Sequence, residues 1–387
     1  MRILFTNNHM VNRAGTELAT SELMQEFRRR GDDVALFTLF PGPVSDEMAE
    51  QGSPVFGPRD MSTLRDWRPD VANIHHWPLS FLLAEAGLTI PSVFGFLGQF
   101  PPIEIPPAME TAVPWYAVSD AGYDDVRRLS GWSTAPGTVI GNWWDDSISL
   151  PPPRDRASGI RNVMVVSNHF PPSQLGMLRA LGEAEQFTVT KIGLPDNSLP
   201  VDATLLKDAD AIVTIGRTAI TGLALGIPVL VWDHFGCDGW VSDDNFQELA
   251  RHNFSGRATR RELTSSDLAG LFGALTQVES DKARDWVRTQ RSLSFSAERI
   301  SELHRSALEL DAAVDWSHPS NERRVLADYA IQAGSFAASH TEHVRTIGRL
   351  RRKLKKLKDA DNAQQGRPGV QSRMSNARAR LSARIRG

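Results

Sequence analysis

Short apolar runs alternate with amphipathic segments along the first 310 residues of the chain. Continuous Val, Ile and Leu runs are typical of buried parallel strands, and apolar residues repeated every three to four positions are typical of helices. Residues 15–30 have the helical spacing, and Gly31 ends that helix. The predicted strands of the first half are 2–7, 34–39, 70–76, 92–98 and 115–119. This alternation predicts an α/β domain with a doubly wound parallel sheet.

The same alternation begins again after a proline-rich polar segment, PPPRDR, at 151–156. Its predicted strands are 162–167, 188–193, 211–216 and 228–232, and helices near 281–290 and 297–310 close the set. A polar segment rich in proline is typical of a linker. We therefore expect two Rossmann-like domains, 1–147 and 148–312, with a cleft that faces both sets of strand carboxyl ends.

The segment 210–232, DAIVTIGRTAITGLALGIPVLVW, forms one complete strand–helix–strand unit. Gly216 allows a tight turn, Thr218 is the expected helix cap, and Gly226 with Pro228 ends the helix. Backbone N–H groups at such a helix start favour a diphosphate, and Arg217 adds a positive charge there. Every α/β domain has several such turns, so an ordinary structural turn is the competing interpretation.

Charge is distributed unevenly along the chain. Residues 341–387 hold 14 basic and 3 acidic residues, a net charge of +11, so residues 1–340 carry −14 of the total of −3. An acidic body argues against nucleic acid as a partner. We expect a basic helical extension over 313–362, with an apolar stripe at positions 347, 350, 354 and 357, and a disordered basic tail over 363–387. An anionic membrane surface and self-association are both open as partners of this basic region.

Cysteine content and the start of the chain indicate the compartment. Cys237 is the only cysteine, MRILFTN leads directly into a strand, and no run of about 18 apolar residues occurs. We expect a cytoplasmic protein, with peripheral attachment to the inner face of the membrane as a further expectation from the basic tail.

Four segments, in order, resemble GT-B glycosyltransferases of the family 4 type. Residues 1–38 resemble the family's opening, with Ala14-Gly15-Thr16-Glu17 matching its Gly-Gly-x-Glu turn, and RPDVANIHHWP resembles its Pro-Asp-x-x-x-x-His segment. In WYAVSDAGYDDVRRLSGWSTAPGTVIGNWWD, the residues Ser119, Asn142 and Asp145 match fixed positions. The unit 210–232 resembles the donor-binding helix of the family.

The resemblance implies transfer of a sugar from a nucleotide-diphosphate donor to a glycan or glycolipid acceptor. It implies that the donor diphosphate binds near Gly216, Arg217, Thr218 and Ala219, and that Gly15 and Thr16 meet acceptor and phosphate. We add Asn168, His169, Gly193 and Asp238 to the expected donor-binding set. Enzymes of this fold generally stabilise the leaving diphosphate with helix N-termini and basic side chains. No metal or other cofactor is therefore expected.

Three family features are absent from this sequence. The two glutamates of retaining members would fall on Val213 and Thr221, and the segment VVSNHFPPSQLG lacks the usual Arg and Lys. Leu97 or Gly98 stands where a His commonly follows a strand. Either Arg217 and His169 substitute as phosphate ligands, or activity is reduced or absent. Both stereochemical outcomes stay open.

His75 and His76 follow a predicted strand at its carboxyl end. An imidazole there is suited to general base catalysis on an acceptor hydroxyl, and a packed histidine is the alternative. Asp208-Ala209-Asp210 has the Asp-x-Asp spelling of a metal site, but it precedes its strand, so we interpret it as a strand entry.

The stretch 232–257 is expected to be a polar and aromatic binding loop after a strand. Trp240 or Phe235 would stack on a base or sugar, and Asp238 or Asp243 would accept hydroxyl groups. Trp143 and Trp144 are interpreted as packing residues at the crossover between the domains.

A nucleotide-sugar glycosyltransferase is the preferred hypothesis. A non-hydrolysing sugar-nucleotide epimerase is the second hypothesis, with Glu17, Asp238 and Asp244 as its candidate carboxylates. The third is a catalytically silent GT-B protein that binds sugars or serves as a scaffold.

Overall fold

The computed structural model describes residues 1–314 apart from 12, 14, 100–102, 108, 110, 130, 151–158 and 194–200. The predicted extension and tail lie outside the described residues, apart from positions 313 and 314. Within the described part, no helix combines the length and the apolar character needed to cross a membrane.

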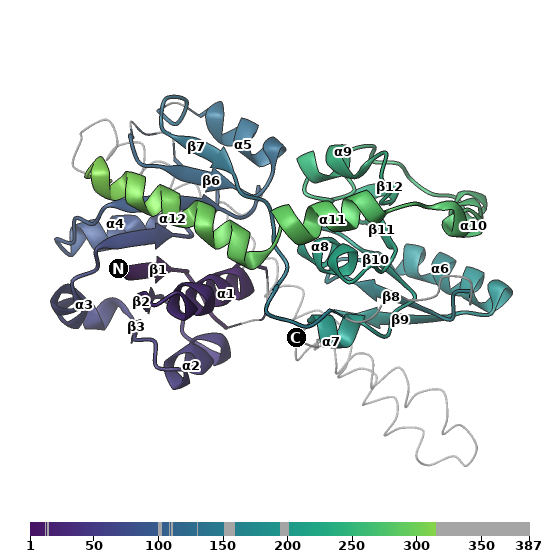
Figure 1. The fold of residues 1–387 in the computed structure, drawn as a ribbon, viewed down its shortest axis with the longest axis horizontal. Coiled ribbons are helices and arrows are strands. Elements are labelled where there is room, and N and C mark those ends of the chain that lie inside the picture. Colours follow the sequence, from purple (N-terminus) through teal and green to yellow (C-terminus); the bar gives the residue numbers. More distant parts are fainter. Residues whose placement is uncertain are drawn as a thin grey trace, which may run out of the picture. The chain divides into compact units, whose positions relative to one another are not determined.

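The first domain is built around a parallel seven-stranded sheet in the order β3-β2-β1-β4-β5-β6-β7 (Figure 1). Its elements are β1 (Arg2–Thr6), α1 (Gly15–Arg29), β2 (Asp33–Phe37), α2 (Pro43–Glu50), β3 (Val55–Phe56), the 3-10 helix η1 (Pro58–Asp60), α3 (Met61–Trp67), β4 (Val71–Ile74), α4 (Pro78–Glu85), β5 (Ser92–Phe96), β6 (Trp115–Ala117), α5 (Asp120–Arg127) and β7 (Gly137–Val139). Every residue of β4 and β5 is buried, as continuous apolar runs predict.

The second domain is built around a five-stranded sheet in the order β12-β11-β10-β8-β9. Its elements are β8 (Asn162–Val166), α6 (Pro172–Glu185), β9 (Thr188–Ile192), α7 (Ala203–Leu206), β10 (Ala211–Thr214), α8 (Arg217–Ala224), β11 (Val229–Asp233), β12 (Gly236–Trp240), α9 (Phe246–Arg251), α10 (Ser265–Gly273), the 3-10 helix η3 (Leu275–Gln277) and α11 (Asp281–Gln290). The strands β8 to β11 are parallel, so the predicted doubly wound architecture is confirmed in both halves.

Three strands were not predicted: β3, β7 and β12. The two-residue β3 is too short to show a pattern, and it pairs with β2 at the edge of the first sheet. The strand β12 runs antiparallel to β11, where we expected a loop. Its sequence GCDGW holds two glycines with φ of +130° and +88°, which hides the alternation of a strand.

The last described helix, α12 (Leu293–Glu309), returns to the first sheet, whereas we placed its residues in the second domain. It packs on α1, β4 and β5, and Figure 1 shows α1 and α12 side by side. Its buried residues include Ile300, His304 and Ala307, and His304 Nε2 lies 3.2 Å from Asn73 Oδ1 of β4. The carbonyl of Ala312 then accepts the N–H of Ser92 at the start of β5. The apolar stripe of α12 predicts a helix, but it does not indicate which of the two sheets that helix covers.

Candidate active site at the strand ends

The carboxyl ends of β1, β4 and β5 share one edge of the first sheet, because these strands are parallel and adjacent. Ligands of open α/β sheets bind beyond this edge. The chain leaves β1 through Asn7, Asn8 and His9, and it leaves β4 through His75 and His76. These five polar residues are the candidates for a ligand-binding site at this edge of the first sheet.

His75 is enclosed in the domain and is not placed to act as a general base. Its side chain is 1% exposed; Nδ1 lies 2.8 Å from Thr20 Oγ1, and Nε2 lies 2.8 Å from the Tyr116 hydroxyl. Burial, followed by the neighbouring His76, lowers the pKa of His75 to about 3. The packed-histidine alternative therefore describes His75, and its predicted catalytic role is not supported by the geometry.

His76 faces the strand-end edge but is also buried, at 3% exposure. It has a left-handed φ of 65°, which is rare outside glycine and clusters at functional sites. Its Nδ1 accepts the N–H of Asn8 at 3.0 Å, so the ring proton lies on Nε2, 3.8 Å from Glu104 Oε1. The Glu104 carboxylate fills the space that a side chain at Gly98 would occupy. His76 is thus a ring held in one orientation, and it supports its neighbour.

That neighbour is His9, whose ring stacks on His76 with centroids 5.6 Å apart and planes within 6°. The His9 side chain is 35% exposed, and its Nε2 lies 3.5 Å from Oε1 of Glu17. Glu17 is fully buried in the first turn of α1, where its Oε2 accepts the Thr16 hydroxyl at 3.0 Å. A carboxylate only accepts, so this contact favours the proton on Nε2 and leaves Nδ1 as the basic atom, which lies 3.4 Å from the side-chain amide nitrogen of Asn8.

We did not predict His9, although the signal was present in the sequence. The rule that selected His75 and His76, a titratable side chain directly after a buried strand, applies equally to TNNH after β1. Gly15 and Thr16, which we did predict, open α1 beside the Glu17–His9 pair. The structure therefore brings the predicted turn together with an unpredicted imidazole.

In the second domain, Gly216 is the N-cap of α8, and Thr218 is already inside the helix. Gly216 has φ of 63°, and its N–H donates to the carbonyl of Phe254. Ala219 is buried and its N–H donates to the Gly216 carbonyl, so this N–H is occupied. The predicted turn before α8 is present, with Arg217 and Thr218 as its partly exposed residues, and anion binding there stays a prediction.

The side chain of Arg217 forms an ion pair with Glu22 of α1. The second oxygen of Glu22 accepts the indole N–H of Trp143 at 2.9 Å. The Arg217 and Glu22 side chains are 22% and 20% exposed. The expected positive charge is therefore present at the start of α8, with an acidic partner from the first domain.

A polar cluster, the Ser167 cluster, lies at the carboxyl ends of β8 and β11. The Ser167 hydroxyl donates to Asp233 Oδ2 at 2.6 Å and accepts the His169 N–H at 2.9 Å. Asp233 is 1% exposed, and His234 Nδ1 lies 3.3 Å from its Oδ1. The His169 and His234 rings meet edge to face at 5.4 Å. His169, a predicted donor ligand, thus belongs to an ordered group on the same sheet edge as α8.

Gly193 is required by the close approach of two strand ends. A Cβ at this position would stand 2.3 Å from the Ser167 carbonyl oxygen, and φ is +113°. We expect Gly193→Ala to destabilise the protein by about 2–4 kcal/mol, through steric overlap and strain. Thermal unfolding measures this loss.

Gly176→Ala is the matched control, because a Cβ there meets no atom within 4 Å and the residue lies inside α6. Alanine in a helix interior is expected to stabilise by up to about 1 kcal/mol. Equal melting temperatures for the two variants would show that the contact at Gly193 has no effect.

The stretch 232–257, expected to be a loop, instead contains β12 and α9. Trp240 is 5% exposed and donates its indole N–H to the Leu271 carbonyl at 2.8 Å, so it cannot stack on a ligand. Asp238 accepts the backbone N–H groups of Ala258 and Thr259, and Asp243 accepts that of Ala283 in α11. These carboxylates therefore stabilise a turn and a helix start within the fold, and their roles in sugar binding stay predictions.

Cys237 is buried, and desolvation raises the pKa of its thiol to about 11, so it is unsuited to nucleophilic attack. Trp143 and Trp144 are 1% and 5% exposed, and their predicted packing role is confirmed.

Asp208 and Asp210 lie at the opposite edge of the second sheet, as the strand-entry interpretation predicted. Asp210 Oδ2 accepts the N–H groups of Arg161 and Asn162 at the start of β8. Among the described residues, no group of three or more His, Cys, Asp or Glu side chains is arranged to hold a metal ion.

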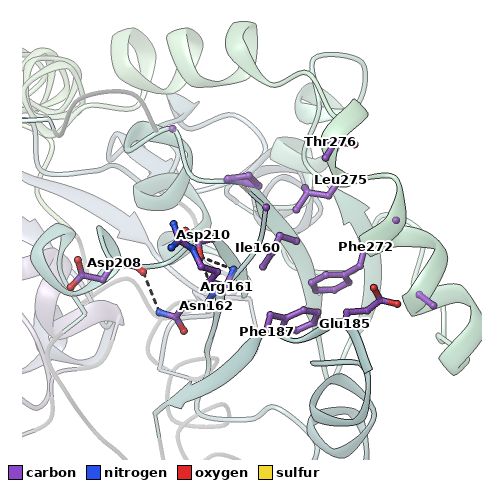
Figure 2. Close-up of a pocket in the computed structure, with 15 residues that line it drawn as sticks. Ile160, Arg161, Asn162, Glu185, Phe187, Asp208, Asp210, Phe272, Leu275 and Thr276 are labelled. Atoms are coloured by element: carbon purple, nitrogen blue, oxygen red, sulfur yellow. Dashed lines mark hydrogen bonds between the residues drawn. The ribbon is translucent and has the colours of Figure 1, made fainter. Parts of the chain in front are cut away.

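A cavity of about 710 Å³ also opens at this amino-terminal edge. Figure 2 shows its labelled residues, among them Phe187 and Phe272, whose rings stack at 5.2 Å. The cavity is lined by Asp208 and Asp210 but by none of the predicted donor-binding residues. It is therefore separate from the strand-end site.

Comparison with known proteins identifies the fold. No protein-family model and no curated protein matches the sequence. The structure is similar to that of Anabaena HepE in complex with UDP and glucose, with a TM-score of 0.56 and 14% identity over 79% of this chain and 100% of that chain. It is also similar to the apo form of the lipopolysaccharide outer core galactosyltransferase WaaB, with a TM-score of 0.52 and 12% identity over 79% and 99%. The chain has the GT-B fold, as predicted.

Proposed function

We propose that the protein is a glycosyltransferase that moves a sugar from a nucleotide-diphosphate donor to a hydroxyl group of a glycan or glycolipid acceptor. The observation that carries the proposal is the Glu17–His9 pair at the strand ends of the first sheet. An imidazole oriented by a buried carboxylate is the arrangement expected of a general base. Similarity to HepE, which was crystallised with UDP and glucose, supports a nucleotide sugar as donor.

In the proposed reaction, the acceptor hydroxyl lies at His9 Nδ1. Its oxygen forms a bond to the anomeric carbon while the bond from that carbon to the diphosphate oxygen breaks. The acceptor proton passes to Nδ1, and the electron pair of the broken bond stays on the departing nucleoside diphosphate. Glu17 stabilises the imidazolium that results, because its carboxylate faces Nε2.

The departing diphosphate is assigned to the start of α8. Gly216 permits close backbone approach, the helix dipole favours negative charge, and Arg217 supplies a cation. His169 and His234 of the Ser167 cluster extend this polar edge. The arrangement supports the substitution expected from sequence, in which Arg217 and His169 take the place of the absent Arg and Lys.

We further propose that the protein belongs to the family 4 type of GT-B glycosyltransferases. The motifs of residues 1–310 support membership of the family 4 type, although the usual glutamate pair is absent. The +11 charge of residues 341–387 supports a glycolipid or polysaccharide acceptor reached at an anionic cytoplasmic membrane face.

Calorimetric titration with UDP, GDP and ADP tests the donor site. We expect one of the three nucleotides to bind to the full chain. Arg217→Ala is expected to weaken the binding of that nucleotide by about ten- to a hundredfold, the range for a lost charge-assisted hydrogen bond. Arg251→Ala serves as the control, since Arg251 is an exposed residue of α9. Absence of binding by all three nucleotides would refute the proposed donor site.

A further inference from the structure

Glu22 is positioned to control the availability of Arg217. It lies on α1 of the first domain, and its two carboxylate oxygens have different partners: Oε1 pairs with Arg217 at the start of α8, and Oε2 accepts the Trp143 indole N–H. A guanidinium that already faces a carboxylate must exchange this partner before it binds a phosphate fully.

We propose that Glu22 is a positioning residue that holds Arg217 in the absence of the donor and releases it to the donor diphosphate. This inference rests on the proposed function and adds a regulatory contact to the same site. The exchange links donor binding to an ion pair between helices of the two domains, α1 and α8. No covalent step is involved, because one anionic partner of the guanidinium replaces another.

The energetics of the pair favour such an exchange. Both side chains are about one-fifth exposed, so water screens their attraction and the pair is weaker than a fully buried one. A diphosphate brings more charge than one carboxylate and is also favoured by the helix start. We therefore expect the diphosphate to displace Glu22 from Arg217. Because this exchange costs free energy, Glu22 lowers the apparent affinity of the protein for the nucleotide.

Glu22→Gln provides a selective test. The glutamine carbonyl still accepts the Trp143 N–H, but the negative charge that holds Arg217 is lost. We expect UDP, or whichever nucleoside diphosphate binds to the wild type, to bind three- to tenfold more tightly to Glu22→Gln. Glu298→Gln is the matched control, because Glu298 also pairs with arginines but belongs to α12, and its affinity is expected to equal that of the wild type.

The double variant Glu22→Gln, Arg217→Ala shows whether Glu22 acts through Arg217. We expect its affinity to equal that of Arg217→Ala alone, because no guanidinium remains to be released. An equal gain in both backgrounds would mean that Glu22 repels the nucleotide directly and would overturn the inference. Unchanged or weaker binding by Glu22→Gln alone would overturn it as well.

The two proposals fail in different ways. If the wild type binds no nucleotide, the proposed function fails. If the wild type binds one and Arg217→Ala weakens it while Glu22→Gln changes nothing, the donor site stands and only the role of Glu22 is refuted.

Discussion

Replacement of His9 by glutamine is expected to lower kcat by a factor of about 10² to 10⁴, the usual contribution of a general base. Glutamine keeps a polar side chain of similar reach but cannot take the acceptor proton. Donor affinity is expected to stay within twofold of the wild type, because the diphosphate is assigned to α8 in the second domain. Release of nucleoside diphosphate measures kcat, and calorimetry measures affinity.

Two further variants separate catalysis from folding. Glu17→Gln keeps His9 but removes the charge beside Nε2, so we expect an intermediate loss of about 10- to 100-fold in kcat. His252→Gln changes a histidine that pairs with Glu248 on the surface, and it should be fully active. A His9→Gln enzyme with more than a third of the wild-type kcat would exclude His9 as the base.

Acidification is expected to destabilise the protein through two buried imidazoles. Burial lowers the pKa of both His75 and His304 from 6.5 to about 3, so both are neutral in the folded state at pH 5. In the unfolded chain they take up protons as the pH falls through 6.5. Between about pH 6.5 and 3 the unfolded state therefore binds more protons than the folded state. The free energy of unfolding decreases as the pH is lowered through that window.

The expected size follows from the two pKa values. From pH 7.5 to pH 5, each imidazole removes about 2 kcal/mol of unfolding free energy, and the pair removes about 4 kcal/mol. Urea denaturation at both pH values measures the loss. His304→Gln should reduce it by about 2 kcal/mol, while His252→Gln should not change it. An unchanged loss in His304→Gln would contradict the neutral, buried state of His304.

The strand pattern was predictable because buried parallel strands are apolar throughout. The strands β1, β4, β8 and β10 lie within predicted runs, and β11 extends one residue beyond its run. Because both sheets are parallel, the polar residues after these strands gather at one edge of each sheet, and the sequence located both edges. Burial at these ends was not predictable. In NIHH the chain turns at His76 with positive φ, so His75 enters the interior while His76 faces His9.

Tertiary contacts account for the remaining differences. The glycines of β12 obscure the alternation by which a strand is recognised. The carboxylates of Asp238 and Asp243 accept hydrogen bonds from backbone N–H groups that are distant in the sequence. The ion pair of Arg217 with Glu22 joins residues 195 positions apart in the sequence, and no local pattern indicates it. His9 was identifiable in principle, but only the fold shows that Glu17 stands beside it.

The most direct test of the central claim is nuclear magnetic resonance of a panel of UDP-, GDP- and ADP-sugars incubated with the full chain, using phosphorus and anomeric proton signals. We predict that one donor is cleaved to nucleoside diphosphate, with the sugar transferred to an added acceptor or slowly to water, and that His9→Gln slows this cleavage by about 10²- to 10⁴-fold. A sugar that is epimerised while still attached to its nucleotide would contradict the account in favour of an epimerase. A nucleotide sugar that binds and stays intact with every acceptor would indicate a catalytically silent GT-B protein.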